Sequence, residues 1–142
     1  MQPQVVICGT YHKDHAGLVR IFRELQYNGC RILSPLSIDF IDLTAPVVKS
    51  ATEQDLPIFD LQAFQLRAMR DADFIFLHAP SGHIGLSAAY EIGYAEALKK
   101  PVFCFEAPQD EMLNCQVTIV RSVFEILETI RPAQSNHRCT EA

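Results

Sequence analysis

Short runs of apolar residues alternate with longer segments of mixed polarity along this chain. A short, continuous apolar run is typical of a strand buried on both faces of a sheet. Apolar residues at the spacing i, i+3, i+4, i+7 indicate instead a helix with one apolar side. We expect strands at residues 4–8, 31–34, 74–77, 102–105 and 117–120, and helices at about 15–28, 60–70, 87–99 and 122–131.

Residues with strong cap preferences mark the ends of two helices. Asp14 is expected to cap the first helix and Gly29 to end it, because aspartate accepts from free backbone N–H groups and glycine tolerates the backbone that follows a helix. Ser122 and Glu125 form a capping box that opens the last helix, and Pro132 stops it. These signals support the helical assignments at both ends of the chain.

The order of these elements predicts the fold. Strands that alternate with helices form a parallel sheet, so we expect an α/β fold of three layers with a doubly wound, five-stranded parallel sheet in the flavodoxin-like order 2-1-3-4-5. The switch point lies between the first and third strands, where the Gly9 turn and the Gly85 loop would face each other. A chain of 142 residues fits one domain, expected at 1–132, with a frayed tail at 133–142.

Two segments between the predicted elements show neither the short apolar run of a buried strand nor the apolar spacing of a helix. Residues 108–114 are expected to form a loop, and residues 36–57, which Pro46 interrupts and Pro57 ends, form a connection of unusual length. Apolar residues such as Phe40 and Ile41 favour a partly ordered lid over a disordered segment.

Charge and cysteine content narrow the class of protein. The net charge of -5 argues against binding to a nucleic acid polymer or a lipid surface, which requires clustered Lys and Arg. No run is long enough to span a membrane, so we expect no membrane association. The five cysteines are scattered and no signal-like segment precedes the first strand, which favours reduced thiols in a cytoplasmic protein. A small-molecule partner is the expectation.

Glu91 is the candidate for chemistry. It lies near the start of the helix predicted at 87–99, where the helix dipole favours an ionised carboxylate that can act as a nucleophile. The alternative is an ordinary acid at a helix start. Ser87 is expected to cap this helix or to bind an anion, and Gln65 is a polar residue on a largely apolar helix face, either bonded to nearby backbone or part of a site.

Several common motifs are missing. There is no GxGxxG after the first strand and no GxxxxGK[ST], so no dinucleotide or P-loop cofactor is expected. His12 with His15, and His78 with His83, lack further ligands at a usual spacing, so no metal is expected either.

Residues 87–95, SAAYEIGYA, followed by 97–102, ALKKPV, resemble the signature of the nucleoside 2-deoxyribosyltransferase superfamily, which includes the 2'-deoxynucleoside 5'-phosphate N-hydrolases. Residues 7–10 and 69–74 are also similar. The resemblance implies that Glu91 attacks the anomeric carbon of a (deoxy)ribose and releases the base, after which water or a second base resolves the glycosyl-enzyme ester. It also implies a homodimer.

The chain departs from the family pattern in the loop at 81–86 before the helix, which is longer than in the hydrolases, and at two single positions. Where the family places an aspartate that assists at the base, this chain has Gln65, and where it places an aromatic hydroxyl on the first strand, this chain has Val6, with Tyr11 as a possible substitute. A replacement acid could come from Asp39, Asp42 or Glu106, or from a neighbouring subunit. The residues expected to bind substrate are Gly9, Thr10, Tyr11, His12, Gln65, Gly85, Ser87 and Tyr90.

Three hypotheses therefore remain open at this stage. The first is an enzyme that cleaves or exchanges the N-glycosidic bond of a nucleoside or nucleotide through Glu91. The second is a nucleotide-binding module on the same fold that has lost turnover, which the replacements at Gln65 and Val6 favour. The third is a structural or interaction domain with an empty crevice.

Overall fold

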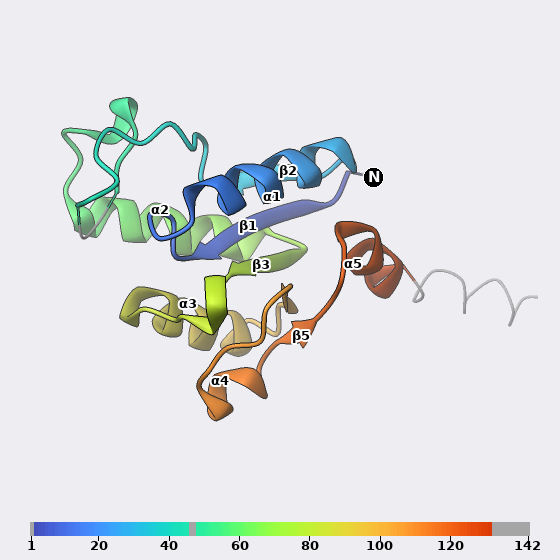
Figure 1. The fold of residues 1–142 in the computed structure, drawn as a ribbon. Coiled ribbons are helices and arrows are strands. Elements are labelled where there is room, and N and C mark those ends of the chain that lie inside the picture. The colour runs from blue at the N-terminus through green and yellow to red at the C-terminus, as the bar shows by residue number, and fades with distance from the viewer. Residues whose placement is uncertain (1, 46–47, 132–142) are drawn as a thin grey trace, which may run out of the picture.

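The computed structural model describes residues 2–45 and 48–131, and these residues form one five-stranded sheet (Figure 1). The strands pair in parallel in the order β2-β1-β3-β4-β5, which confirms the predicted topology. Their bounds are β1 Gln4–Gly9, β2 Arg31–Ser34, β3 Phe74–His78, β4 Val102–Cys104 and β5 Thr118–Ile119.

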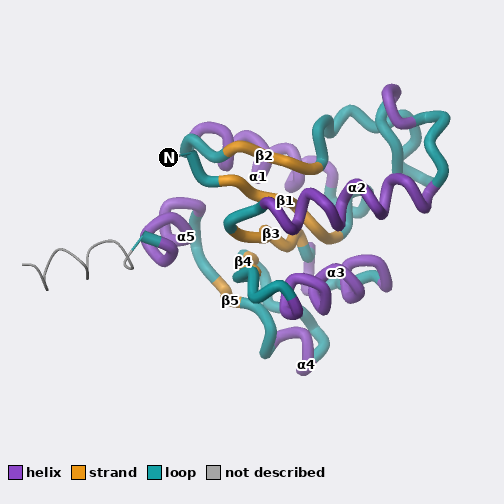
Figure 2. The backbone as a smooth tube through the Cα atoms, turned by 180° about the vertical axis from the view of Figure 1, so that it is seen from behind, coloured by secondary structure: helices purple, strands orange, loops and turns teal. Residues whose placement is uncertain are grey.

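Helices cover both faces of the sheet, as the views from the two sides show (Figures 1 and 2). Alternate residues of a strand point to opposite faces of the sheet and so form two separate core clusters. One cluster includes residues of α1 and α5, and the other includes residues of α2 and α3, so each pair of helices packs on its own face. β3 is buried along its whole length. The helix bounds are α1 His15–Tyr27, α2 Ile58–Asp71, α3 Leu86–Ala97, α4 Glu111–Asn114 and α5 Val123–Ile130.

The predicted helix caps of α1 and α5 are present. The Asp14 side chain accepts from the Gly17 backbone N–H, and the Ser122 side chain accepts from the Glu125 N–H. Glu125 itself accepts from the backbone N–H of Arg121 at 2.7 Å and not from that of Ser122, so the second bond of the predicted capping box is displaced by one residue. Both helices therefore begin where the capping residues indicated.

The loop predicted at 108–114 was wrong in part, because its second half is the short helix α4. Asp110 caps this helix by accepting from the Leu113 N–H at 3.0 Å. A single helical turn is too short to show a 3.6-residue apolar period, so only its cap could have revealed it.

Gly9 closes the contact between β1 and β3. It pairs with His78, and a Cβ atom at Gly9 would lie 2.1 Å from the His78 carbonyl oxygen. Its φ of +114° is also one that glycine adopts far more readily than other residues. The adjacent Thr10 N–H donates to the same carbonyl at 3.1 Å. The turn after β1 thus lies directly beside the end of β3, at the predicted switch point.

The connection between β2 and α2 makes ordered contacts over its described residues. Phe40 forms an antiparallel bridge with Ser50, and its ring stacks on Tyr11 with centroids 5.7 Å apart. His15 Nε2 lies 2.8 Å from the Ile38 carbonyl oxygen. A 3-10 helix at Ala51–Glu53 follows. These contacts attach the connection to the turn after β1 and to the start of α1, and its role as a lid stays a prediction.

Three further predictions concern parts of the chain away from this edge. The tail predicted at 133–142 lies outside the described residues. Within the described ranges, none of the helices is both long and apolar enough to cross a membrane. The four cysteines in this part of the chain, Cys8, Cys30, Cys104 and Cys115, are free thiols.

Candidate functional site

Glu91 lies on the side of α3 that faces the sheet. It belongs to the buried side of α3 together with Ala88, Ile92 and Ala95, at i-3, i+1 and i+4, and only 8% of the residue is exposed. The Gln62 amide, on the neighbouring helix α2, donates to the Glu91 Oε1 atom at 3.3 Å. The side chain of the predicted nucleophile is therefore buried, and it contacts α2 at Gln62.

The start of α3 differs from the prediction. The helix begins at Leu86 with Gly85 as its N-cap residue, and no side chain caps it. Of the two alternatives for Ser87, the helix cap is therefore wrong and the anion-binding role stays a prediction, and Glu91 lies in the second turn rather than the first. Burial thus governs the charge of Glu91 more than the helix dipole does, since the dipole's effect fades beyond the first turn.

Burial raises the pKa of the Glu91 carboxyl above the ordinary value of 4.5, because the charged form loses hydration. Hydrogen-bonding interactions with Cys8, Gln62 and Gln65 lower the pKa again in part. Within the described residues, no ion pair involves Glu91. In the part of the chain that the structure describes, the groups that interact with the Glu91 carboxyl are thus neutral.

Cys8 and Tyr11 face Glu91 from the end of β1 and the turn after it. Burial, followed by the nearby charge of Glu91, raises the pKa of both the Cys8 thiol and the Tyr11 hydroxyl well above their ordinary values. Both groups therefore stay protonated at neutral pH. The Tyr11 hydroxyl donates to the Ile7 carbonyl, so its proton is already used within the protein.

Gln65 is held at both ends of its amide. The Ser34 hydroxyl donates to its Oε1 atom, and its Nε2 atom donates to the Ile7 carbonyl oxygen at 3.1 Å and to the Tyr11 hydroxyl at 3.4 Å. These bonds join α2 to β1 and β2. Gln65 thus has the backbone hydrogen bond that one of the two sequence-based alternatives described, and it also lies in the cluster around Glu91. We call Cys8, Tyr11, Gln62, Gln65 and Glu91 the Glu91 cluster.

Two members of the cluster were not among the predicted site residues. Cys8 was read as a small apolar residue of a strand, which its burial also satisfies. Gln62 precedes Gln65 by three residues and so lies on the same face of α2, a spacing that could have revealed it.

The remaining predicted residues lie at the same edge of the sheet, outside the hydrogen bonds of the cluster. Thr10 is buried and bonded to the end of β3, and Gly9 packs against His78. The others are open to solvent to different degrees: His12, Ser87 and Tyr90 are exposed, and a Cβ atom at Gly85 would meet no other atom within 4 Å.

The candidate replacement acids are engaged elsewhere. The carboxylate of Asp42 accepts from the Thr44 hydroxyl and backbone N–H, which lowers the pKa of Asp42. Asp39 is exposed, and Glu106 accepts from the Ser81 N–H at 3.2 Å. Among the described residues, no second carboxylate is hydrogen-bonded into the Glu91 cluster.

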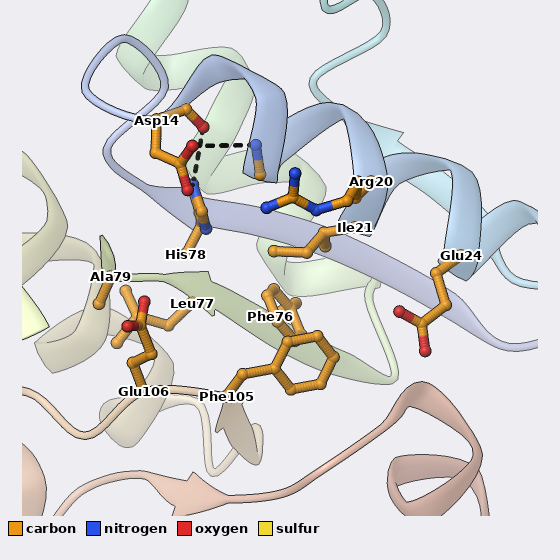
Figure 3. A pocket seen from close by; sticks show the side chains of 11 residues that line it. Asp14, Arg20, Ile21, Glu24, Phe76, Leu77, His78, Ala79, Phe105 and Glu106 are labelled. Carbon is orange, nitrogen blue, oxygen red and sulfur yellow. Dashed lines mark hydrogen bonds and ion pairs between the residues drawn. The ribbon is translucent and has the colours of Figure 1, made fainter. Parts of the chain in front are cut away.

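A separate cavity of ≈ 390 Å³ lies on the opposite face of the sheet, between α1 and the ends of β3 and β4 (Figure 3). His78 lies against its upper wall, with Nε2 3.1 Å from the Asp14 carbonyl oxygen, and Phe76 and Phe105 lie at its floor. None of the residues that line it belongs to the Glu91 cluster. Its polar rim carries the carboxylates of Asp14, Glu24 and Glu106 and one guanidinium, that of Arg20.

No group of three or more His, Cys, Asp or Glu side chains suited to a metal ion occurs in the part of the chain that the structure describes. Two of the histidines noted in the sequence contact backbone carbonyl groups: His15 lies against Ile38 of the lid, and His78 against Asp14 at the start of α1.

The model of the family described as nucleoside 2-deoxyribosyltransferase matches residues 7–134. The chain belongs to this family. The match runs from β1 through α5 and includes every residue of the Glu91 cluster, so the resemblance seen in the sequence is confirmed. Nucleoside deoxyribosyl transfer, or a related reaction on nucleosides, is the activity that this family indicates. No curated protein matches the chain.

Proposed function

We propose that this protein cleaves the N-glycosidic bond of a nucleoside or nucleotide, or transfers its (deoxy)ribosyl group, with Glu91 as the nucleophile. The observation that carries this proposal is the buried Glu91 carboxylate, which receives a hydrogen bond from Gln62 and is not paired with a cation in the described residues. A carboxylate that is neither hydrated nor neutralised gains free energy when it bonds to carbon.

The reaction proceeds in two steps. One Glu91 oxygen bonds to the anomeric carbon while the bond from that carbon to the base nitrogen breaks, and the base leaves with the electron pair and takes up a proton. Water in a hydrolase, or the nitrogen of a second base in a transferase, then bonds to the same carbon while its bond to the Glu91 oxygen breaks. Glu91 leaves as a carboxylate, and the attacking group gives up its proton. Attack from the opposite face in each step retains the configuration of the sugar.

The edge around the cluster supplies the groups that would hold the substrate. The turn formed by Gly9, Thr10 and His12 and the start of α3 at Gly85 and Ser87 would hold the sugar or a 5'-phosphate, with free backbone N–H groups at the helix start favouring an anion. Tyr11, Gln65 and Tyr90 would flank the base. We expect no cofactor, a cytoplasmic location and a homodimer.

A specific observation supports a second candidate, a nucleotide-binding module without turnover. Gln65 stands where the family carries an acid, cannot transfer a proton, and has both ends of its amide bonded within the protein. The departing base would then have to take its proton from solvent or leave as an anion.

Base release distinguishes the two candidates. The protein is incubated with deoxynucleosides, ribonucleosides and their 5'-monophosphates, and free base is measured by chromatography for the wild type and the Glu91→Ala variant. We expect release that falls by at least about a hundredfold in the variant, the usual scale for loss of a group acting in the transition state. The matched control is Glu96→Ala, an exposed acid on the same helix, which should retain the wild-type rate.

Binding of a nucleotide with no release of base would favour the inactive module, and release that survives in Glu91→Ala would contradict the proposed nucleophile. Addition of a second free base separates the two active forms, because a transferase forms a new nucleoside whereas a hydrolase yields free sugar only.

A further inference from the structure

We infer that Gln62 is the positioning residue that holds the Glu91 carboxylate in place and keeps it ionised. The inference rests on the proposed function in so far as Glu91 is the nucleophile. Its basis is the contact between the two side chains, in which the Gln62 Nε2 atom lies 3.3 Å from Glu91 Oε1. The two residues belong to neighbouring helices, α2 and α3, so this bond crosses from one helix to the other.

The other neutral donors near Glu91 are committed elsewhere. Gln65 donates to the Ile7 carbonyl and the Tyr11 hydroxyl, and Tyr11 donates to Ile7. Cys8 also interacts with the carboxylate, but a thiol is a weak hydrogen-bond donor and this one is fixed within a buried strand. Gln62 therefore contributes the one amide donor to Glu91 whose nitrogen bonds no other group in the described ranges.

Gln62 is also placed to adjust to a substrate. It is partly buried, whereas Gln65 is buried, and its amide oxygen accepts no hydrogen bond from any residue that the structure describes. Rotation of the amide would leave Glu91 without this donor, so the position of Gln62 affects the nucleophile directly. Gln65, by contrast, is bonded at both ends of its amide.

The groups that face Glu91 come from β1, from the turn after it and from α2. Cys8 and Tyr11 are titratable but stay neutral, and the α2 residues in contact, Gln62 and Gln65, carry no charge. Glu53 of the lid acts on Tyr11 by its charge. A charge introduced at position 62 would therefore change the titration of Glu91 without competition from an existing cation.

The test uses two substitutions with opposite expected effects. Gln62→Leu removes the donor but keeps a helix-forming side chain of similar size, and should raise the pKa of Glu91 by about one unit, the scale of a lost hydrogen bond to a charged group. Gln62→Lys places an ammonium group beside the carboxylate and should lower the pKa by a similar amount. Gln116→Leu is the matched control. Gln116 is exposed and lies between α4 and β5, so this substitution should leave the pKa of Glu91 unchanged.

The pKa of Glu91 is measured by carbon-13 NMR of the side-chain carboxyl groups, with the resonance assigned from its loss in Glu91→Gln. Base release is measured over the same pH range, and its acidic limb should move in the same direction as the pKa, with about tenfold less activity on that limb for each unit of upward shift. The KM should change less than kcat, because Gln62 acts through Glu91 and not on the substrate.

The outcomes separate the two proposals. If neither Gln62→Leu nor Gln62→Lys moves the Glu91 resonance relative to the control, or if both move it in the same direction, the role of Gln62 is contradicted even where base release persists. If the resonance shifts as expected but none of the variants, nor the wild type, releases base, the function proposed for Glu91 is contradicted while its coupling to Gln62 stands.

Discussion

At the scale of single residues, the Glu91 carboxylate is held in a position that costs stability. A glutamate that is only 8% exposed has given up most of its hydration, and the neutral donors around it replace only part of that loss. Buried ionisable groups of this kind are found mainly at functional sites. The same carboxylate at the surface would be fully solvated and therefore less reactive. The stability of the protein should therefore report on Glu91 independently of any substrate.

We predict that Glu91→Gln stabilises the protein at neutral pH. The folded protein raises the pKa of Glu91 above the ordinary 4.5, so the wild type gains stability from the protonated form below that pH and loses it as the pH rises through the folded-state pKa. Glutamine is always neutral and can still accept from Gln62. The variant should gain on the order of 1 kcal/mol at pH 7 and nothing near pH 4, the usual scale for relieving a strained functional site.

Urea denaturation at a series of pH values measures this difference. The control is Glu96→Gln, which removes an exposed charge from the same helix and should leave the free energy of unfolding within about 0.5 kcal/mol of the wild type. A loss of stability in Glu91→Gln at pH 7 would mean that the ionised carboxylate is better satisfied than its surroundings indicate.

The sequence identified Glu91 for a reason that the structure corrects. The helix dipole was the argument, yet α3 begins at Leu86 and Glu91 lies in its second turn, where that effect is weak. Its position on the buried side of α3 is what matters, and this could be read from the apolar neighbours at 88, 92 and 95. Cys8 could not be found in this way, because a buried thiol in a strand has the same sequence pattern whether or not it faces a carboxylate.

At the scale of elements, the junction between β1 and β3 places the turn after β1 at the site. Gly9 makes this possible because any side chain there would meet the His78 carbonyl, and because its φ is +114°. Gly29, after α1, also has a positive φ, +82°, but a Cβ atom there would meet nothing within 4 Å. A side chain at position 29 would therefore cause backbone strain alone, whereas a side chain at position 9 would cause backbone strain and a steric clash.

We predict that Gly9→Ala destabilises the protein by roughly 3 kcal/mol or more, since it adds a clash between backbone atoms to the cost of the unfavourable φ. Gly29→Ala should cost only about 1 kcal/mol, the contribution of the left-handed backbone by itself. Both values come from urea denaturation followed by circular dichroism. Equal losses in the two variants would show that the end of β3 moves aside readily and that the junction is not rigid.

Elements with a long apolar period were predictable, and short or irregular ones were not. α1, α2 and α5 begin and end within about two residues of their predicted bounds, because caps and periodic residues agree in α1 and α5 and the apolar period alone marks α2. α4 has a single turn and shows no period, and the order in the β2–α2 connection depends on the stacking of Phe40 against Tyr11, a contact between segments far apart in sequence. Tertiary contacts of this kind leave no local pattern.

At the scale of the whole molecule, the alternation of strands and helices in the sequence predicted the order of the sheet, but it did not predict where the cavity lies. Parallel strands joined by helices have few possible topologies, so the order β2-β1-β3-β4-β5 could be inferred from the pattern. The ≈ 390 Å³ cavity lies instead on the α1 face, opposite the Glu91 cluster, where α1 and the ends of β3 and β4 meet, and no local pattern in the sequence marks such a place. The two hydrophobic cores share one sheet, which links their stabilities.

Because β1 and β3 contribute to both cores, we predict that the protein unfolds in a single transition whichever core is weakened. Leu18→Ala removes a fully buried side chain of α1 from one core, and Ile92→Ala removes one of α3, 1% exposed, from the other. Each should cost about 2–5 kcal/mol through lost burial and the cavity left behind. Far-ultraviolet circular dichroism and tyrosine fluorescence, followed together in urea, should give coincident curves for each variant. If Ile92→Ala instead produced an early fluorescence change with α1 and the sheet intact, the α2–α3 layer would be a separate cooperative unit, and the Glu91 cluster would open without global unfolding.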